Sequence, residues 1–155
     1  MGGGRADVMR WLLFLHVAGV AFWLGGIAAL YVLYRKAAVR SWERGQELAY
    51  ETAKSVVKGI LNPSALVVLG TGIVMIMQLG LMGRARPFWL SFMEQFGGMV
   101  AILSAALLTW QLRRVDRAGS EEERDRRWRQ LHRTMAYIGA GVVATILVVI
   151  LRVNV

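Results

Sequence analysis

Two ionisable side chains lie inside long apolar segments of this 155-residue sequence, and they are the residues best placed to do chemistry. His16 lies in WLLFLHVAGVAFWLGG, residues 11–26, and Glu94 lies in SFMEQFGG, residues 91–98. An imidazole can bind a metal or carry a proton, and a carboxylate can orient that imidazole, relay a proton or bind metal itself. Ionisable groups are costly in an apolar segment, so both residues are candidates for function.

The surroundings of His16 favour a ligand site. On a helix, His16 shares a face with Gly19 and Trp23, at i+3 and i+7. Gly19 removes side-chain bulk one turn from the imidazole, so a planar ligand could approach there. The alternative is a histidine that is hydrogen-bonded to a neighbouring helix, with Gly19 serving helix packing.

Glu94 is expected at a depth similar to that of His16, so the two could meet across a bundle as a histidine with its carboxylate, a proton relay or two metal ligands. The alternative is a carboxylate that reaches water directly. Gly97 and Gly98 follow on adjacent faces of its helix and again leave room. Met93 is a candidate ligand too, because thioethers bind Cu(I) and can complete the ligation of a histidine-bound haem. Methionine is also an ordinary apolar filler.

The second histidine, His132, lies between Arg129 and Arg133 at the basic end of the last apolar segment. We interpret it as an interfacial histidine in contact with water, and the alternative is a second haem or proton site on that side. The chain has no cysteine, which excludes disulfides and thiolate metal sites, and two histidines cannot form a three-histidine zinc site.

The elements that must position these residues are four apolar segments. The chain is 56% apolar and 19% charged with a mean hydropathy of +0.46, more apolar and less charged than a soluble domain. Each segment exceeds the ~20 residues that a spanning helix needs, and none alternates as a barrel strand would. We therefore expect an all-α integral membrane four-helix bundle, a single transmembrane domain over residues 1–155, with spans at about 8–34, 57–82, 88–112 and 131–151.

The distribution of the basic residues behind the net charge of +9 mainly indicates how the chain is oriented in the membrane. The connections 35–56 and 113–130, with the residues that border them, hold 14 of the 19 basic residues. The positive-inside rule predicts cytoplasmic connections and both termini outside a plasma (inner) membrane that the chain crosses several times. No basic groove with stacking aromatics is present, so no nucleic-acid partner is expected. The stretch after Ser120 predicts a capped helix start, and Pro63 predicts a kink in the second span.

Residues 11–26 resemble the first helix of the HemJ-type protoporphyrinogen oxidases and of the related CopD-like (copper resistance) membrane domains. The matching residues are Leu15-His16, Trp23 and Gly25-Gly26; Pro63 with Thr71-Gly72 and Phe88-Trp89-Leu90 are similar to later parts of that pattern. The resemblance implies haem b binding by His16. The HemJ-type family also carries an essential lysine near the start of its third helix, where this chain has Glu94 and Gln95, and this departure speaks against porphyrinogen oxidation.

The leading functional hypothesis is a b-type haem protein of the membrane, with the haem in the outer half, His16 as an axial ligand and Met93 opposite it. Glu94 would handle protons, and the role would be electron transfer or oxidation of a small substrate such as a quinone or a porphyrin. The alternative is copper binding or transport through His16, Glu94 and the outer methionines. The third is a structural or interaction subunit, including a homo-oligomer, which Ala21-xxx-Gly25 and Gly139-x-Gly141 would allow through close helix packing.

Overall fold

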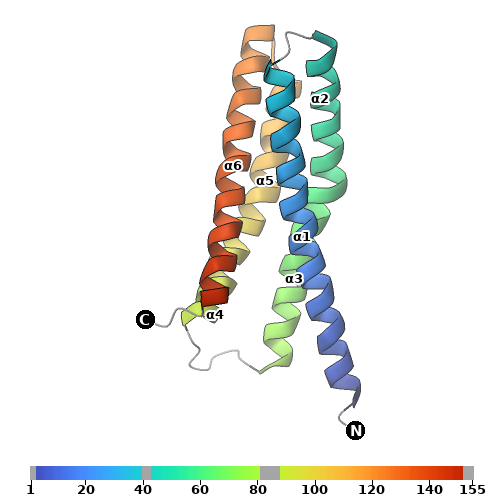
Figure 1. Cartoon of the computed structure of the whole chain (residues 1–155), viewed down its shortest axis with the longest axis vertical. Coiled ribbons are helices and arrows are strands. Elements are labelled where there is room, and N and C mark those ends of the chain that lie inside the picture. The colour runs from blue at the N-terminus through green and yellow to red at the C-terminus, as the bar shows by residue number, and fades with distance from the viewer. Residues whose placement is uncertain (1–2, 40–42, 81–87, 152–155) are drawn as a thin grey trace.

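The computed structural model describes residues 3–39, 43–80 and 88–151, and within them the chain is helical apart from turns (Figure 1). Four helical rods are long and apolar enough to cross a membrane, which confirms the predicted all-α membrane bundle. The first rod is α1 (Gly3–Val39) and the last is α6 (Glu121–Leu151). The second rod joins α2 (Glu43–Val56), η1 (Val57–Leu61) and α3 (Asn62–Gln78), and the third joins α4 (Phe88–Phe92), η2 (Met93–Gly97) and α5 (Gly98–Asp116).

The two long connections are largely helical extensions of the spans. Helix α1 continues to Val39 and α2 begins at Glu43, so most of residues 35–56 is helix. Between α5 and α6 the helix breaks at Gly119-Ser120, as predicted. The Ser120 Oγ accepts a 3.2 Å hydrogen bond from the Glu123 N–H, which caps the start of α6. The short connection expected at 83–87 lies outside the described residues.

The first turns of α1 and the last turns of α6 lie at the same end of the bundle (Figure 1). We call this the terminal end, and we call the other, where the two long connections lie, the charged end. Helix α1 packs mainly on α3, and α5 packs mainly on α6. At the charged end, the first and second rods lie close to α5 and α6 (Figure 1). Toward the terminal end, α1 and α3 diverge from α6 and the third rod (Figure 1).

The apolar core is concentrated where the rods lie close together. The most deeply buried large side chains, each at most 3% exposed, lie toward the charged end and the middle: Trp23, Leu30, Val57, Leu61, Leu108, Leu112, Val115, Leu131 and Met135. In the terminal half, no residue of 88–97 or 143–151 is buried, and Gly19 is the one buried residue among the described side chains of residues 4–22. Large apolar side chains such as Phe14, Phe22 and Ile150 are instead exposed, as expected of helices that face lipid.

Glycines set the close contacts between rods. Gly139 lies against Ile27, and Gly141 lies against Val100, so both face the inside of the bundle. They therefore serve packing within the chain. Gly25 is exposed and has open space around the position of its missing Cβ, so Ala21-xxx-Gly25 remains on the outer surface.

Two π-helical turns interrupt the second and third rods. In η1, the Asn62 N–H bonds to the carbonyl of Val57, five residues back, and the next residue, Pro63, has no N–H to continue the α pattern. Directly before Pro63, where the sequence predicts a kink, the structure has this π turn. The second π turn, η2, contains Met93 and Glu94, and nothing in the local sequence predicts it.

Candidate functional site at His16

The imidazole of His16 connects α1 to α3. Its Nδ1 lies 3.0 Å from the Thr71 Oγ1, across 55 residues of sequence. The imidazole is partly buried and Thr71 is 9% exposed, so their hydrogen bond is largely shielded by the two helices. The hydrogen bond to a neighbouring helix, which the sequence offered as the alternative to a ligand site, is present in the structure.

The direction of this hydrogen bond follows from the Thr71 hydroxyl. The Thr71 Oγ1 donates to the carbonyl of Val67, 2.6 Å away, one turn earlier in α3. A hydroxyl has one proton, so its lone pairs are what remain for His16. With the Thr71 proton on that carbonyl, the His16 tautomer that pairs with Thr71 is the one that carries its proton on Nδ1 and donates it. The neutral ring then has its lone pair on Nε2, which is the nitrogen that a metal would take.

The glycines around the imidazole have different roles from those expected. A Cβ on Gly19 would lie 2.9 Å from the Val68 Cγ2 and 3.4 Å from the Ser64 carbonyl oxygen, so Gly19 serves the close approach of α1 to α3. The glycine that borders the ring is Gly72, where a Cβ would lie 3.5 Å from the His16 Cε1. The space at Gly19 is thus occupied by α3.

Trp23 lies on the same face of α1 as His16, two turns toward the middle of the bundle, and is 3% exposed. Its Nε1–H is buried and has no hydrogen-bond partner among the described residues. Buried indole N–H groups usually find a partner. The core therefore holds an unused hydrogen-bond donor on the His16 side of the bundle.

Met93 and Glu94 lie in η2, which packs against α6, whereas the helix that carries His16 packs mainly against α3. Both side chains are half-buried. A Cβ on Gly97 would lie 3.3 Å from the Thr145 Cγ2, and one on Gly98 would lie 3.7 Å from the Leu69 Cδ1. These two glycines thus allow α6 and α3 to approach the third rod. Glu94 lies on the third rod and His16 on α1, and these two rods diverge toward the terminal end (Figure 1).

The described part of the chain contains no group of three or more histidine, aspartate or glutamate side chains that could hold a metal ion. A bare divalent metal that needs several such ligands therefore finds no complete set there. One imidazole with a directed lone pair is a different case, because it suffices for a cofactor that supplies most of its own metal ligands.

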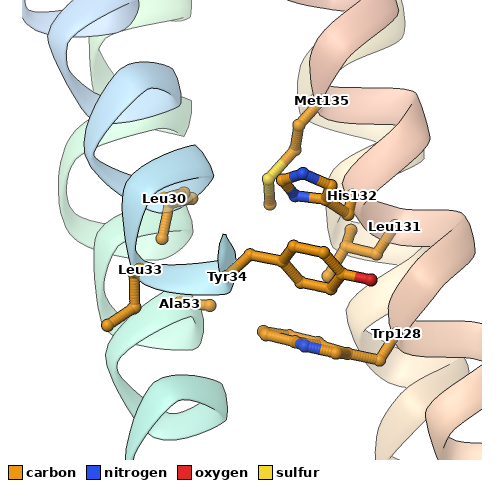
Figure 2. Close-up of a pocket in the computed structure, with 8 residues that line it drawn as sticks. All are labelled: Leu30, Leu33, Tyr34, Ala53, Trp128, Leu131, His132 and Met135. Atoms are coloured by element: carbon orange, nitrogen blue, oxygen red, sulfur yellow. The ribbon is translucent and has the colours of Figure 1, made fainter. Parts of the chain in front are cut away.

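His132 lies near the charged end in a cluster of aromatic rings (Figure 2). Its ring stacks on Tyr34, with centroids 3.7 Å apart and planes 12° apart, and also on Tyr31 at 4.9 Å. In Figure 2 the Tyr34 ring lies between His132 and Trp128, whose ring centroid is 6.2 Å from that of Tyr34. The space left among these side chains is about 10 Å³, enough for about one water molecule. His132 is half-buried and packed against these rings.

A polar network joins α2, α5 and α6 at the charged end. The Tyr50 hydroxyl donates to the Asp116 Oδ1 at 2.5 Å, and the Lys54 Nζ lies 3.4 Å from the same oxygen. Asp116 lies beyond the apolar segment that ends at Leu112. The hydrogen bond from Tyr50, opposed by partial burial and aided by Lys54, holds the pKa of Asp116 below its ordinary value. The residues that form this network are 62–66 positions apart, so no local pattern marks them.

No protein-family model, curated protein or solved structure gives a significant match to this chain. The function is therefore inferred from the chemistry of the site itself.

Proposed function

We propose that this chain is an integral membrane protein that binds haem b in the terminal half of its bundle, with the Nε2 of His16 as an axial ligand. The observation that carries the proposal is the hydrogen-bond chain from His16 to Thr71 to the Val67 carbonyl. That chain fixes the tautomer and the orientation of the ring, which is how proteins prepare a histidine for a metal.

The ligand set of the described residues favours haem over a bare ion. A porphyrin supplies four nitrogen ligands to its iron, so the protein needs to supply one or two. His16 provides one, and Met93 is the proposed second. The absence of a cluster of three acidic or histidine ligands in the described residues is compatible with haem but unfavourable for zinc.

Two further observations bear on the proposal. Few side chains of the terminal half are buried, so the apolar core does not extend through it. The unpartnered Trp23 N–H is a buried donor that a polar group of the ligand could use. The glycines do not form the flat cradle expected from the sequence, since Gly19, Gly97 and Gly98 contact neighbouring helices.

When bound, haem b supplies one-electron redox chemistry. The residues of this chain would hold it and control protons: Thr71 keeps the His16 ring in the ligating tautomer, and Glu94 would exchange protons with water at the terminal end. The reaction class is electron transfer or oxidation of a small membrane-soluble substrate, such as a quinone or a porphyrin. In keeping with the positive-inside rule, we place the terminal end outside the plasma membrane.

The test is a haem titration of the purified full chain, followed by oxidised and reduced absorption spectra. We expect a Soret band with one haem per chain, its loss in His16→Gly, and its recovery when imidazole is added to that variant. Thr71→Val, which removes the hydroxyl at nearly constant shape, should weaken haem binding about 10–100-fold. His132→Ala is the matched control and should bind haem as the native chain does. No uptake, or an unchanged spectrum in His16→Gly, would refute the proposal.

Copper(I) binding is the second candidate, and the position of Met75 favours it. Met75 lies one turn beyond Thr71 on the same face of α3, and Met9 lies two turns from His16 on the same face of α1. Both thioethers are half-buried. A Cu(I) competition titration with the double variant Met9→Leu/Met75→Leu tests this candidate. One tightly bound copper that the double variant loses, together with no haem uptake, would favour copper.

A further inference from the structure

The charged ends of α5 and α6 carry a surface of exposed arginines and aromatic rings. Arg117, Arg126 and Arg133 are exposed and form no salt bridge with any described residue. By contrast, Arg124 pairs with Glu47, and Arg127 pairs with Glu123. We call the set the arginine surface and define it by its six members: Trp110, Arg114 and Arg117 on α5, and Arg126, Arg133 and Tyr137 on α6.

These six residues lie on the outer sides of two neighbouring helices. On α5, Trp110, Arg114 and Arg117 follow one another at i, i+4 and i+7, away from the buried Leu108 and Leu112. The Arg114 guanidinium lies over the Trp110 ring, 4.7 Å from its centroid. The indole thus holds the position of that cation.

The α6 row is joined to the α5 row through the helix interface. The Gln111 Nε2 donates to the Thr134 Oγ1 at 2.8 Å, and Arg127 donates to the carbonyl of Arg114. These bonds fix the register of the antiparallel helices. Arg133 and Tyr137 lie one turn apart on the outer side of α6, away from the buried Leu131. The two rows therefore form one continuous surface across both helices.

The order of residues along the bundle matches the layers of a membrane. Exposed apolar side chains such as Leu103 and Leu107 come first, followed by the exposed rings of Trp110 (51%) and Tyr137 (78%). The arginines lie beyond them toward the charged end. Aromatic rings favour the membrane interface, and guanidinium groups bind phosphate through paired hydrogen bonds.

We propose that the arginine surface binds the phosphate headgroup of an anionic phospholipid, whose acyl chains lie along the apolar part of α5. Arg117, Arg126 and Arg133 hold the phosphate, and Trp110 and Tyr137 lie at the glycerol level. The charge of the surface is complementary to an anionic leaflet, and its position beside lipid-exposed helix selects a lipid over a soluble anion. This proposal is independent of the cofactor at His16.

The experiment measures lipid binding by native mass spectrometry of the full chain with phosphatidylglycerol or phosphatidylcholine. We expect phosphatidylglycerol to bind at least tenfold more tightly. Each arginine near the surface is worth about fivefold in affinity, so Arg117→Gln/Arg133→Gln should weaken phosphatidylglycerol binding by about twentyfold. The charge-matched control is Arg35→Gln/Lys36→Gln, which removes two exposed cations from α1 and should change binding less than threefold.

The variant Arg117→Lys/Arg133→Lys should keep most of the affinity, and far-UV circular dichroism should show that all variants keep their helix content. Equal affinities for the two lipids would overturn the proposal, as would an equal loss in the α1 control. Binding of a soluble polyanion such as RNA with the same arginine dependence, in phosphatidylcholine nanodiscs and without preference for phosphatidylglycerol, would also overturn it.

Discussion

The contact between Gly26 and Leu61 yields a sharp test of the packing. A Cβ built on Gly26 would lie 2.7 Å from the Leu61 Cδ2 and 3.3 Å from its Cγ. Carbon atoms in favourable contact are ~3.5–4.0 Å apart, so Gly26→Ala requires a displacement of roughly 1 Å. Leu61 is 1% exposed, so either its side chain changes conformation inside the packed core or α1 moves away from the second rod. The strain therefore falls on the contact between the two rods.

The neighbouring Gly25 provides the control. Gly25 is exposed and has nothing within 4 Å of the Cβ position, so Gly25→Ala adds only the helix preference of alanine, about 0.5–1 kcal/mol. Gly26→Ala gains the same preference but adds an overpacking cost of about 1–3 kcal/mol. The difference in unfolding free energy between the two variants is then about 1–3 kcal/mol. At ~2–4 °C per kcal/mol, this corresponds to roughly 2–12 °C in melting temperature.

The assay is thermal unfolding of both variants in the same detergent, followed by circular dichroism at several heating rates. We expect Gly25→Ala to melt at or above the native temperature and Gly26→Ala to melt below it. Equal melting temperatures for the two alanine variants would show that α1 does not pack on the second rod through Gly26. The test therefore depends on which variant has the lower melting temperature, and an effect of the detergent on both variants does not change that comparison.

Three further predictions concern the charged end and the terminal turn. Ser120→Ala should lower the unfolding free energy by about 1 kcal/mol in thermal melts, because the Glu123 N–H loses its cap, and Ser120→Asp should restore it. Since the pKa of Asp116 is lowered in the folded state, its stabilisation is present above about pH 4 and lost as the pH falls further. Tyr50→Phe should reduce this dependence in melts from pH 7 to 3, and an unchanged profile would contradict the role of Tyr50. Gly80→Ala should cost about 1–2 kcal/mol in melts, because Gly80 has a φ of +62°.

The sequence predicts the helices of this chain well because lipid allows few alternatives. A spanning segment must satisfy its own backbone, so four long apolar runs predict four rods. Local chemistry also predicts the break at Gly119-Ser120, where a side chain caps the next helix. Pro63 predicts a kink, and the structure has a π turn directly before it. The second π turn at 93–97 has no proline after it, and no local residue pattern predicts it.

The partners of the candidate site are harder to predict, and the reason is physical. In a soluble helix the apolar face marks the inside, but a membrane helix is apolar on its lipid side as well. The apolar pattern therefore predicts that His16 lies in the membrane. It does not predict that Thr71, 55 residues away, is its hydrogen-bond partner. The same holds for the stacking of His132 on Tyr34, which depends on how α1 lies beside α6.

In this bundle, hydrogen-bonded polar side chains identify the helix contacts more clearly than apolar side chains do. Besides the bond between His16 and Thr71, Asn62 donates to the Thr109 Oγ1 at 2.9 Å and links α3 to α5. Gln111 likewise links α5 to α6 through Thr134. In lipid, a polar group must find a partner on a neighbouring helix, so each of these pairs specifies a helix contact. The bond between His16 and Thr71 is such a structural link, and under the proposed haem binding it would also orient the axial ligand, so replacement of Thr71 by valine tests both roles.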